Sequence, residues 1–187
     1  MRKLKLQKQL SVDGYVAGPD GEMDWMTWNF DDGLKQYLMG INAPIDCVIM
    51  GRNLAQGFIP HWEAYNDNPE TADEFSQKMV DAHKIVFSKT LTQSEWDNTE
   101  VVNGDMVHAV NELKAKAGGD IIAYGGAGFV SSLIKADLID EYHLCINPAA
   151  IGNGMPIFKD LQGSHNLRLI SANGYDCGIA VLCYHKV

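Results

Sequence analysis

The order of apolar and polar residues along the chain predicts strands that alternate with helices. KLKLQKQLSV, residues 3–12, alternates with a period of two, which indicates a strand. GPDG at residues 18–21 packs four turn-forming residues together, so residues 15–25 are expected to form a loop. Short apolar runs predict further strands at residues 46–51, 84–88, 99–103, 120–126 and 140–148.

Patterns with helical spacing or helix-end signals lie between these strands. They predict helices at residues 31–41, 68–84, 104–118 and 128–138. Asp31 or Asp32 is the expected N-cap of the first helix. Two strands near the C-terminus, at 166–172 and 178–186, are expected to join around Asn173 and Gly174. This order predicts an α/β fold with a mostly parallel sheet, helices on both faces and an antiparallel C-terminal hairpin.

Composition limits the classes of function. A chain of 187 residues favours a single domain, residues 1–187. The net charge of −9 argues against a nucleic-acid partner, because such surfaces need clustered lysine and arginine. No apolar stretch reaches the roughly 18 residues that span a bilayer, so no membrane partner is expected. The four cysteines lack CxxC spacing and the six histidines are scattered, which indicates a cytoplasmic protein with reduced thiols and no metal site.

A glycine cluster separates a predicted strand from a predicted helix. In AYGGAGFVSSL, residues 123–133, three glycines stand at Gly125, Gly126 and Gly128. One interpretation is a tight corner in which the helix packs closely on the strand. The other is a phosphate cradle, where backbone N–H groups at a helix N-terminus bind an anion. The pattern is neither GxGxxG nor a Walker A sequence, so the cluster alone does not decide between the two.

Two other predicted strands end in residues that suit an anion. VIMGRN ends with Gly51 and Arg52, and IVFSKT ends with Ser88, Lys89 and Thr90. Ligands of open α/β sheets bind outside the carboxyl ends of the strands. Each of these residues also has a structural interpretation, as a surface charge or a turn cap. Together on one edge of the sheet they predict a site for a ligand that carries several phosphates.

Four stretches make a family resemblance visible. They are SVDGYVAGPDGEMDW, VIMGRN, KIVFSKTL and YGGAGFVSSLIKADLIDEYHLCINPAAIGNGMPIF. With these stretches the chain resembles the dihydrofolate reductase-like family that includes the C-terminal reductase domain of bifunctional riboflavin-synthesis enzymes. The resemblance implies a three-layer αβα fold around an eight-stranded sheet, NADPH bound across the strand ends, and a homodimer.

The resemblance also implies roles for particular residues. The glycine-rich turn resembles the family's pyrophosphate turn, Arg52 faces the cofactor phosphates, and Ser88 and Lys89 meet the adenosine 2′-phosphate. Met23 and Trp25 lie on the mobile part of a loop beside the substrate. The implied cofactor-binding residues are Val16, Ala17, Gly51, Arg52, Ser88, Lys89, Thr90, Tyr124, Gly125, Gly126, Ala127, Gly128 and Phe129.

The chain departs from the family pattern at three points. Leu54 stands where family members commonly have a threonine after the second strand, so one hydroxyl contact is lost. Tyr124 replaces the carboxylate that precedes the glycine pair in the riboflavin enzymes, which weakens an assignment to their pyrimidine substrate. The deaminase domain of the bifunctional enzymes has no counterpart, so only reduction could be inherited.

A reductase needs a proton source, and the acidic residues near the N-terminus are candidates. Asp31 is the first candidate and Asp32 the second, because a carboxyl group buried beside a nicotinamide has a raised pKa. Each could instead cap a helix, as Asp13 could instead end a strand. Tyr124, at a strand end, is expected to be a packed aromatic rather than an acid.

These features predict an NADPH-dependent oxidoreductase that reduces a small planar heterocycle or a related C=N or C=O substrate. Two alternatives stay open. One is a sensor or binding module that holds NADPH without efficient turnover, and the other is a true dihydrofolate reductase. The lack of an unambiguous proton donor favours the sensor, whereas the loop at residues 15–25 favours catalysis.

Overall fold

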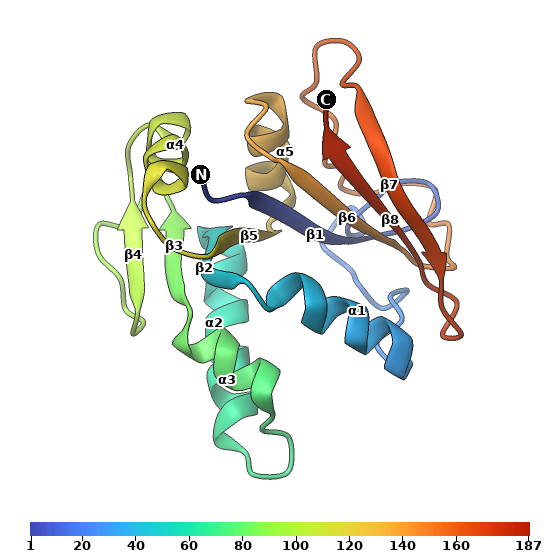
Figure 1. The fold of residues 1–187 in the computed structure, drawn as a ribbon, viewed down its shortest axis with the longest axis horizontal. Coiled ribbons are helices and arrows are strands. Elements are labelled where there is room, and N and C mark those ends of the chain that lie inside the picture. Colours follow the sequence, from blue (N-terminus) through green and yellow to red (C-terminus); the bar gives the residue numbers. More distant parts are fainter.

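One eight-stranded sheet runs through the protein, and the computed structural model describes residues 1–187. The strands are β1 (Leu4–Leu10), β2 (Ile45–Gly51), β3 (His83–Phe87), β4 (Thr99–Val102), β5 (Asp120–Gly125), β6 (Glu141–Ile146), β7 (Leu167–Gly174) and β8 (Ala180–Lys186). Their order across the sheet is β4-β3-β2-β5-β1-β6-β8-β7 (Figure 1). All pairs from β4 to β6 are parallel, and β8 is antiparallel to both β6 and β7. The predicted fold class, including the antiparallel C-terminal strands, is therefore confirmed.

Helices cover both faces of this sheet. They are α1 (Asp32–Asn42), α2 (Arg52–Asp67), α3 (Glu74–Asp81), α4 (Met106–Ala115) and α5 (Ala127–Lys135). Alternate residues of β2 face the two layers: Cys47 and Ile49 pack in one core cluster with α4 and α5, and Val48 and Met50 pack in another with α2. Figure 1 shows α1, α2 and α3 on one side of the sheet and α4 and α5 on the other. No helix is both long and apolar enough to cross a bilayer.

The longest helix of the chain, α2, was not predicted from the sequence. Its sequence contains Gly57 and Pro60, both of which disfavour a helix interior. Tertiary packing overrides these local preferences, because Ala55 and Ile59 are fully buried against β2 and β3. Trp62 extends the packing through edge-on contacts with Phe58, at 6.1 Å, and with Phe75, at 5.2 Å between ring centroids.

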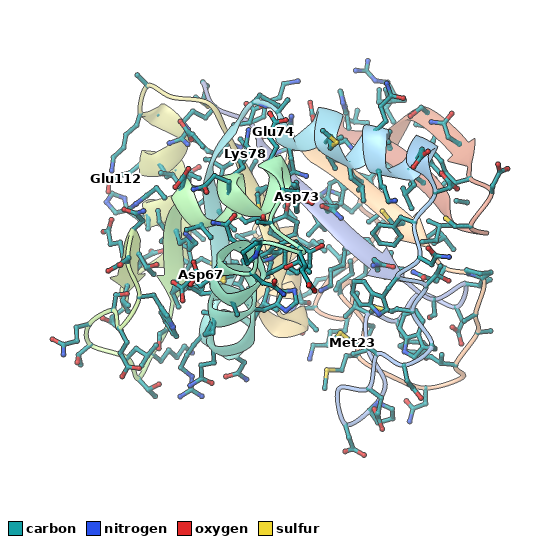
Figure 2. The ribbon with its side chains drawn as sticks, turned by 90° about the horizontal axis from the view of Figure 1, so that it is seen from below. Met23, Asp67, Asp73, Glu74, Lys78 and Glu112 are labelled. Atoms are coloured by element: carbon teal, nitrogen blue, oxygen red, sulfur yellow. The ribbon has the colours of Figure 1, made fainter.

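Two predicted boundaries are wrong. The helix expected at residues 68–84 begins at Glu74, which Figure 2 labels beside Asp73. Asp73 and Ser76 form a reciprocal capping box at this start. The hairpin turn expected at Asn173 and Gly174 lies instead at residues 175–179, where Tyr175 N–H donates to the Ile179 carbonyl over 2.9 Å.

The sheet opens at its centre, where β1 and β5 stop pairing. Their last paired residues are Leu6 and Ala123, yet β1 continues to Leu10 with β6 as its only neighbour. The carboxyl ends of β2, β3 and β5 meet beside this opening. In open α/β sheets such a position is the usual place for a ligand.

Candidate functional site

A cavity of about 600 Å³ lies at this edge of the sheet. Its size falls within the roughly 300–1,000 Å³ of typical ligand sites. It brings together most of the residues that the sequence singled out: Val16, Ala17, Met23, Gly51, Arg52, Ser88, Lys89, Thr90, Gly126, Ala127, Gly128 and Phe129. The glycine cluster and the two other strand ends therefore share one cavity. Tyr124, Gly125 and Trp25 are not part of its lining.

Two helices begin at the cavity without a side-chain cap. The N-cap of α2 is Gly51 and that of α5 is Gly126, and neither position provides a side-chain hydrogen bond. The remaining helices are capped by carboxylates, at Asp31, Asp73 and Asp105. An uncapped N-terminus keeps free N–H donors and the positive end of the helix dipole. Both uncapped N-termini thus open on the same cavity.

The glycines at the cavity serve different purposes. A Cβ atom added to Gly126 or Gly128 would have no other protein atom within 4 Å. Packing around the two residues therefore does not demand glycine, and a side chain there would enter open space at the cavity. A Cβ atom at Gly51 would lie 3.1 Å from Phe129 Cβ, so Gly51 also allows β2 and α5 to approach closely. Gly125, at φ +147°, precedes a cis peptide bond to Gly126.

Cationic and hydroxyl side chains complete this end of the cavity. Arg52 Nη1 donates to Thr90 Oγ1 over 3.1 Å. Ser88 Oγ accepts from the Thr90 and Leu91 N–H groups, at 3.1 and 2.9 Å, and so orders the turn after β3. The Lys89 side chain is exposed. No Asp or Glu is among the lining residues, although the chain has a net charge of −9, so the site suits a polyanion.

The loop of residues 15–25, here termed the covering loop, forms another wall. Val16 N–H donates to the Met155 carbonyl over 3.0 Å, and Met155 N–H donates to the Ala17 carbonyl over 2.9 Å. These bonds fix the buried start of the loop against residues 154–156. Met23, farther along the loop, is half exposed at the cavity (Figure 2). Trp25 instead donates its indole N–H to the Glu22 carbonyl, over 3.2 Å.

Tyr124 faces away from the cavity. Its ring stacks on Phe58, with 5.3 Å between ring centroids, and its hydroxyl donates to Asn42 Oδ1 over 2.6 Å. Burial raises the pKa of the Tyr124 hydroxyl well above its usual value. Tyr124 is therefore a packed aromatic, and it reaches the site through its carbonyl, which accepts from Lys8 Nζ over 3.0 Å.

The candidate proton donors lie outside the cavity. Asp31 caps α1, accepting from the Leu34 N–H over 2.9 Å and from the Cys177 N–H over 2.9 Å. These bonds lower the pKa of Asp31, which is the opposite of what a proton donor at neutral pH needs. The Asp32 carboxylate is fully exposed, 3.8 Å from Lys35. Asp31 acts as the predicted N-cap, and the structure gives neither aspartate a place in the cavity.

Several lining residues were not assigned to the site from the sequence: Lys8, Gly21, Asn53, Leu54, Phe87 and Met155. Most of them neighbour residues that were predicted. Lys8 differs, because it comes from the middle of β1. The sequence did contain a signal for it, since Lys8 continues the alternation of Leu4, Leu6 and Leu10 on one face of the strand.

Comparisons with known proteins identify the family of this chain. Residues 2–181 match the model of the RibD C-terminal domain. The uncharacterized protein YyaP of Bacillus subtilis (strain 168) is 32% identical over 98% of this chain and 95% of its own. A putative riboflavin biosynthesis protein from Shewanella sp. PV-4 superposes with a TM-score of 0.74 and 24% identity, covering 100% of this chain and 99% of the other. Dihydrofolate reductase from Enterococcus faecalis, complexed with NADP(H), superposes with a TM-score of 0.64 and 15% identity, covering 98% and 96%. The chain therefore belongs to the RibD C-terminal domain family and has a dihydrofolate reductase-like fold.

Proposed function

We propose that this protein is an NADPH-dependent oxidoreductase that reduces a small planar heterocycle or a related substrate with a C=N or C=O bond. One observation carries the proposal. Two uncapped helix N-termini, at Gly51 and Gly126, open on one cavity with Arg52 and Lys89 and without a carboxylate. Such a site suits a ligand with several phosphates. The bound NADP(H) of the structurally similar E. faecalis enzyme agrees with it.

The residues present fit a phosphorylated dinucleotide. Open space beside Gly126 and Gly128 would receive the diphosphate at the start of α5, with the Arg52 guanidinium close by. Ser88 and Lys89, after β3, would bind the 2′-phosphate. Val16, in the covering loop, would offer its backbone to the nicotinamide amide. The bound dinucleotide would supply a hydride, while the covering loop would exclude water and orient the substrate.

The open alternatives differ in how well they fit. A true dihydrofolate reductase needs a carboxylic acid to protonate the pterin, and the cavity lining contains no Asp or Glu. The absence of a carboxylate also favours a neutral or anionic substrate over a cationic one. A sensor would need no substrate site. Met23, however, lines the cavity from the covering loop and remains half exposed, so its side chain is free to contact a substrate. These features favour a reductase of a substrate other than folate.

The proposal is tested in two steps. NADPH is first titrated against the protein, with binding followed by the change in nicotinamide fluorescence. The loss of NADPH absorbance is then followed with a panel of pyrimidines, cyclic imines, planar ketones and dihydrofolate. We expect saturable binding and turnover of a substrate other than dihydrofolate. No binding would refute the proposal, binding without turnover would favour the sensor, and turnover of dihydrofolate alone would favour the folate reductase.

Asp31→Asn is expected to keep the NADPH oxidation rate of the unmodified protein. Asparagine caps a helix as well as aspartate does but cannot donate the proton of a carboxylic acid. Asp31→Ala is expected to lower the Tm at neutral pH. Because the pKa of Asp31 is lowered, the stability that it provides is present at neutral pH and is lost as the pH falls through that pKa. The difference in Tm between Asp31→Ala and the unmodified protein should therefore shrink in acid. A large loss of activity in Asp31→Asn would restore Asp31 as the proton donor.

The expected homodimer is a further part of the proposal. The edge strand β7 exposes Leu169 and Ile170, which are 53% and 47% accessible. An apolar sheet edge promotes association with other chains unless it is covered. We expect a second copy to cover this edge, which a molar mass from light scattering would show. A monomer at micromolar concentration would contradict it.

A further inference from the structure

A lysine occupies an apolar face of the sheet beside the cavity. Leu4, Leu6 and Leu10 of β1 are buried in the core cluster with α4 and α5, and Lys8 occupies the remaining position on that face. Lys8 Nζ donates one hydrogen bond, over 3.0 Å, to the Tyr124 carbonyl across the opening between β1 and β5. An ammonium has three N–H donors. Two of them are therefore left without a protein partner beside the cavity.

The fully buried lysines have structural partners, whereas Lys8 is partly buried. Lys5 pairs with Asp120 at 3.0 Å, and Lys114 pairs with Asp140 at 2.6 Å. Lys84 donates to the carbonyls of Val80 and Ala82, at the C-terminal end of α3, over 2.7 and 3.0 Å. Lys8 donates to one carbonyl and pairs with no carboxylate, so contacts within the protein use only one of its three N–H donors.

The surroundings of Lys8 favour release of its proton. Burial lowers the pKa of Lys8 from 10.5 to about 8, so the ammonium is mostly protonated at pH 7 and can still give up its proton near neutrality. The other charged groups of the cavity lining are Arg52 and Lys89, and both are cations. The charged residues of the covering loop are Asp20, Glu22 and Asp24, and none of them forms an ion pair with Lys8. On β5, the Tyr124 hydroxyl is directed at Asn42, so only its carbonyl meets the ammonium.

We propose that Lys8 is the proton donor of the reduction and delivers its proton to the nitrogen or oxygen of the substrate's C=N or C=O bond. This inference rests on the proposed function. The substrate carbon takes a hydride, with both of its electrons, from the dihydronicotinamide. The electron pair of the double bond moves to the nitrogen or oxygen, which takes the proton from Lys8 Nζ. The products are the reduced substrate, the oxidised dinucleotide and a neutral Lys8 amine, which regains a proton from water.

Charge balance in the cavity supports this assignment. Loss of a hydride leaves a positive charge on the nicotinamide ring, and loss of a proton removes a positive charge from Lys8. The cavity near Lys8 therefore holds the same charge before and after the step. An ammonium that kept its proton would instead face the cationic ring of the oxidised dinucleotide.

The first test needs no substrate. The affinities of the protein for NADPH and for NADP⁺ are measured across the pKa of Lys8, from about pH 6 to about pH 10. The two ligands share their phosphates and differ by one positive charge on the ring. A protonated Lys8 repels that charge, so the affinity for NADP⁺ relative to NADPH should rise with pH, by about tenfold or more for two like charges a few ångströms apart. In Lys8→Met this ratio should not change with pH through that range. Lys116→Met, which removes an exposed lysine, is the matched control and should behave as the unmodified protein does.

The second test follows the rate of hydride transfer in single turnovers with a substrate from the panel. The rate should fall as the pH rises through about 8, because the protonated form of Lys8 is the active one. Lys8→Met should lose about 10²- to 10⁴-fold in rate, the usual contribution of a general acid. Lys8→Arg keeps the charge but cannot release a proton, so a similar loss is expected. Added small primary amines should partly restore the rate of Lys8→Ala.

The outcomes separate the two proposals. If the unmodified protein does not bind NADPH, the proposed function fails and this inference fails with it. Suppose instead that the unmodified protein binds NADPH. If the affinity for NADP⁺ relative to NADPH then depends on pH in the same way in Lys8→Met, or does not depend on pH in either protein, only the role of Lys8 is refuted. Full hydride-transfer activity in Lys8→Arg would also refute proton donation, since it would reduce Lys8 to an electrostatic role. Removal of an unpaired, partly buried cation should raise the Tm of Lys8→Met, so a folding defect is not expected to obscure the result.

Discussion

Gly128→Asp is expected to weaken NADPH binding strongly while it raises the Tm of the protein. Gly128 is the second residue of α5, and a Cβ atom there would meet no other protein atom within 4 Å. Glycine in a helix is less favourable than alanine by roughly 0.5–1 kcal/mol, and aspartate recovers part of that difference. An acid in the first turn of a helix adds about 0.3–1 kcal/mol through the dipole. The same carboxylate would stand where the diphosphate is proposed to bind, so repulsion of like charges should weaken binding by at least about a hundredfold, or about 2.7 kcal/mol.

The matched control is Gly128→Asn, which has nearly the same shape and no charge. It should keep most of the gain in Tm that comes from the loss of glycine. Its affinity for NADPH should fall only as far as its side chain crowds the diphosphate. Thermal denaturation without ligand and fluorescence titration with NADPH give the two quantities. Equal affinities of the Asp and Asn variants would place the phosphates elsewhere and return the glycines to a role in packing.

Opposite effects on stability and binding are expected because the site keeps groups that the fold alone would not select. Asp31, Asp73 and Asp105 cap the helices that begin away from the cavity. Gly126 stands at the same position of α5, where glycine is less stabilising than a capping side chain by a few tenths of a kcal/mol. Lys8 likewise interrupts an apolar face with a charge. Proteins commonly sacrifice stability in this way at functional sites.

The sequence could predict those parts of the site for which a general rule connects a local sequence pattern to a position in the fold. Gly51, Ser88 and Gly126 follow apolar runs, and the carboxyl ends of parallel strands meet at one edge of a sheet. Three segments far apart in the chain were therefore predicted to lie together, and the cavity brings them together. The overall fold followed from the same alternation of strands and helices.

Other features depend on tertiary structure and could not be predicted so well. Helix α2 contains Gly57 and Pro60, and the burial of Ala55 and Ile59 against the sheet explains why it stays helical. The role of Asp31 was ambiguous, because the sequence pattern suits both an N-cap and a proton donor. Only the hydrogen bonds from the Leu34 and Cys177 N–H groups, which lower the pKa of Asp31, decide between the two roles. Lys8 is difficult to predict as a site residue because it looks like one more polar residue of an alternating strand, although it lies on the face of Leu4, Leu6 and Leu10.

A preference for NADPH over NADH is the remaining expectation for the site. The two cofactors differ by the 2′-phosphate, which a chain of net charge −9 can bind only where cations are gathered locally. Lys89 is exposed at the end of β3, and Arg52 lies beside it through the bond to Thr90. A protein that selects NADH commonly places an acid on the ribose hydroxyls, and no acid lines this cavity.

Lys89→Glu is therefore expected to remove most of the preference for NADPH while NADH binds nearly as before. A charge-assisted hydrogen bond to a phosphate contributes roughly 1.5–3 kcal/mol, so Lys89 alone should give about a tenfold to hundredfold preference. Lys89→Met, which removes the charge without reversing it, should fall between the unmodified protein and Lys89→Glu. Added salt should reduce the preference in the unmodified protein, since the site is open to solvent and its charges are screened. Dissociation constants for both cofactors, measured in the three proteins at two salt concentrations, test each step. Equal affinities of the unmodified protein for NADPH and NADH would contradict the proposed placement of Lys89 and Arg52 at the 2′-phosphate.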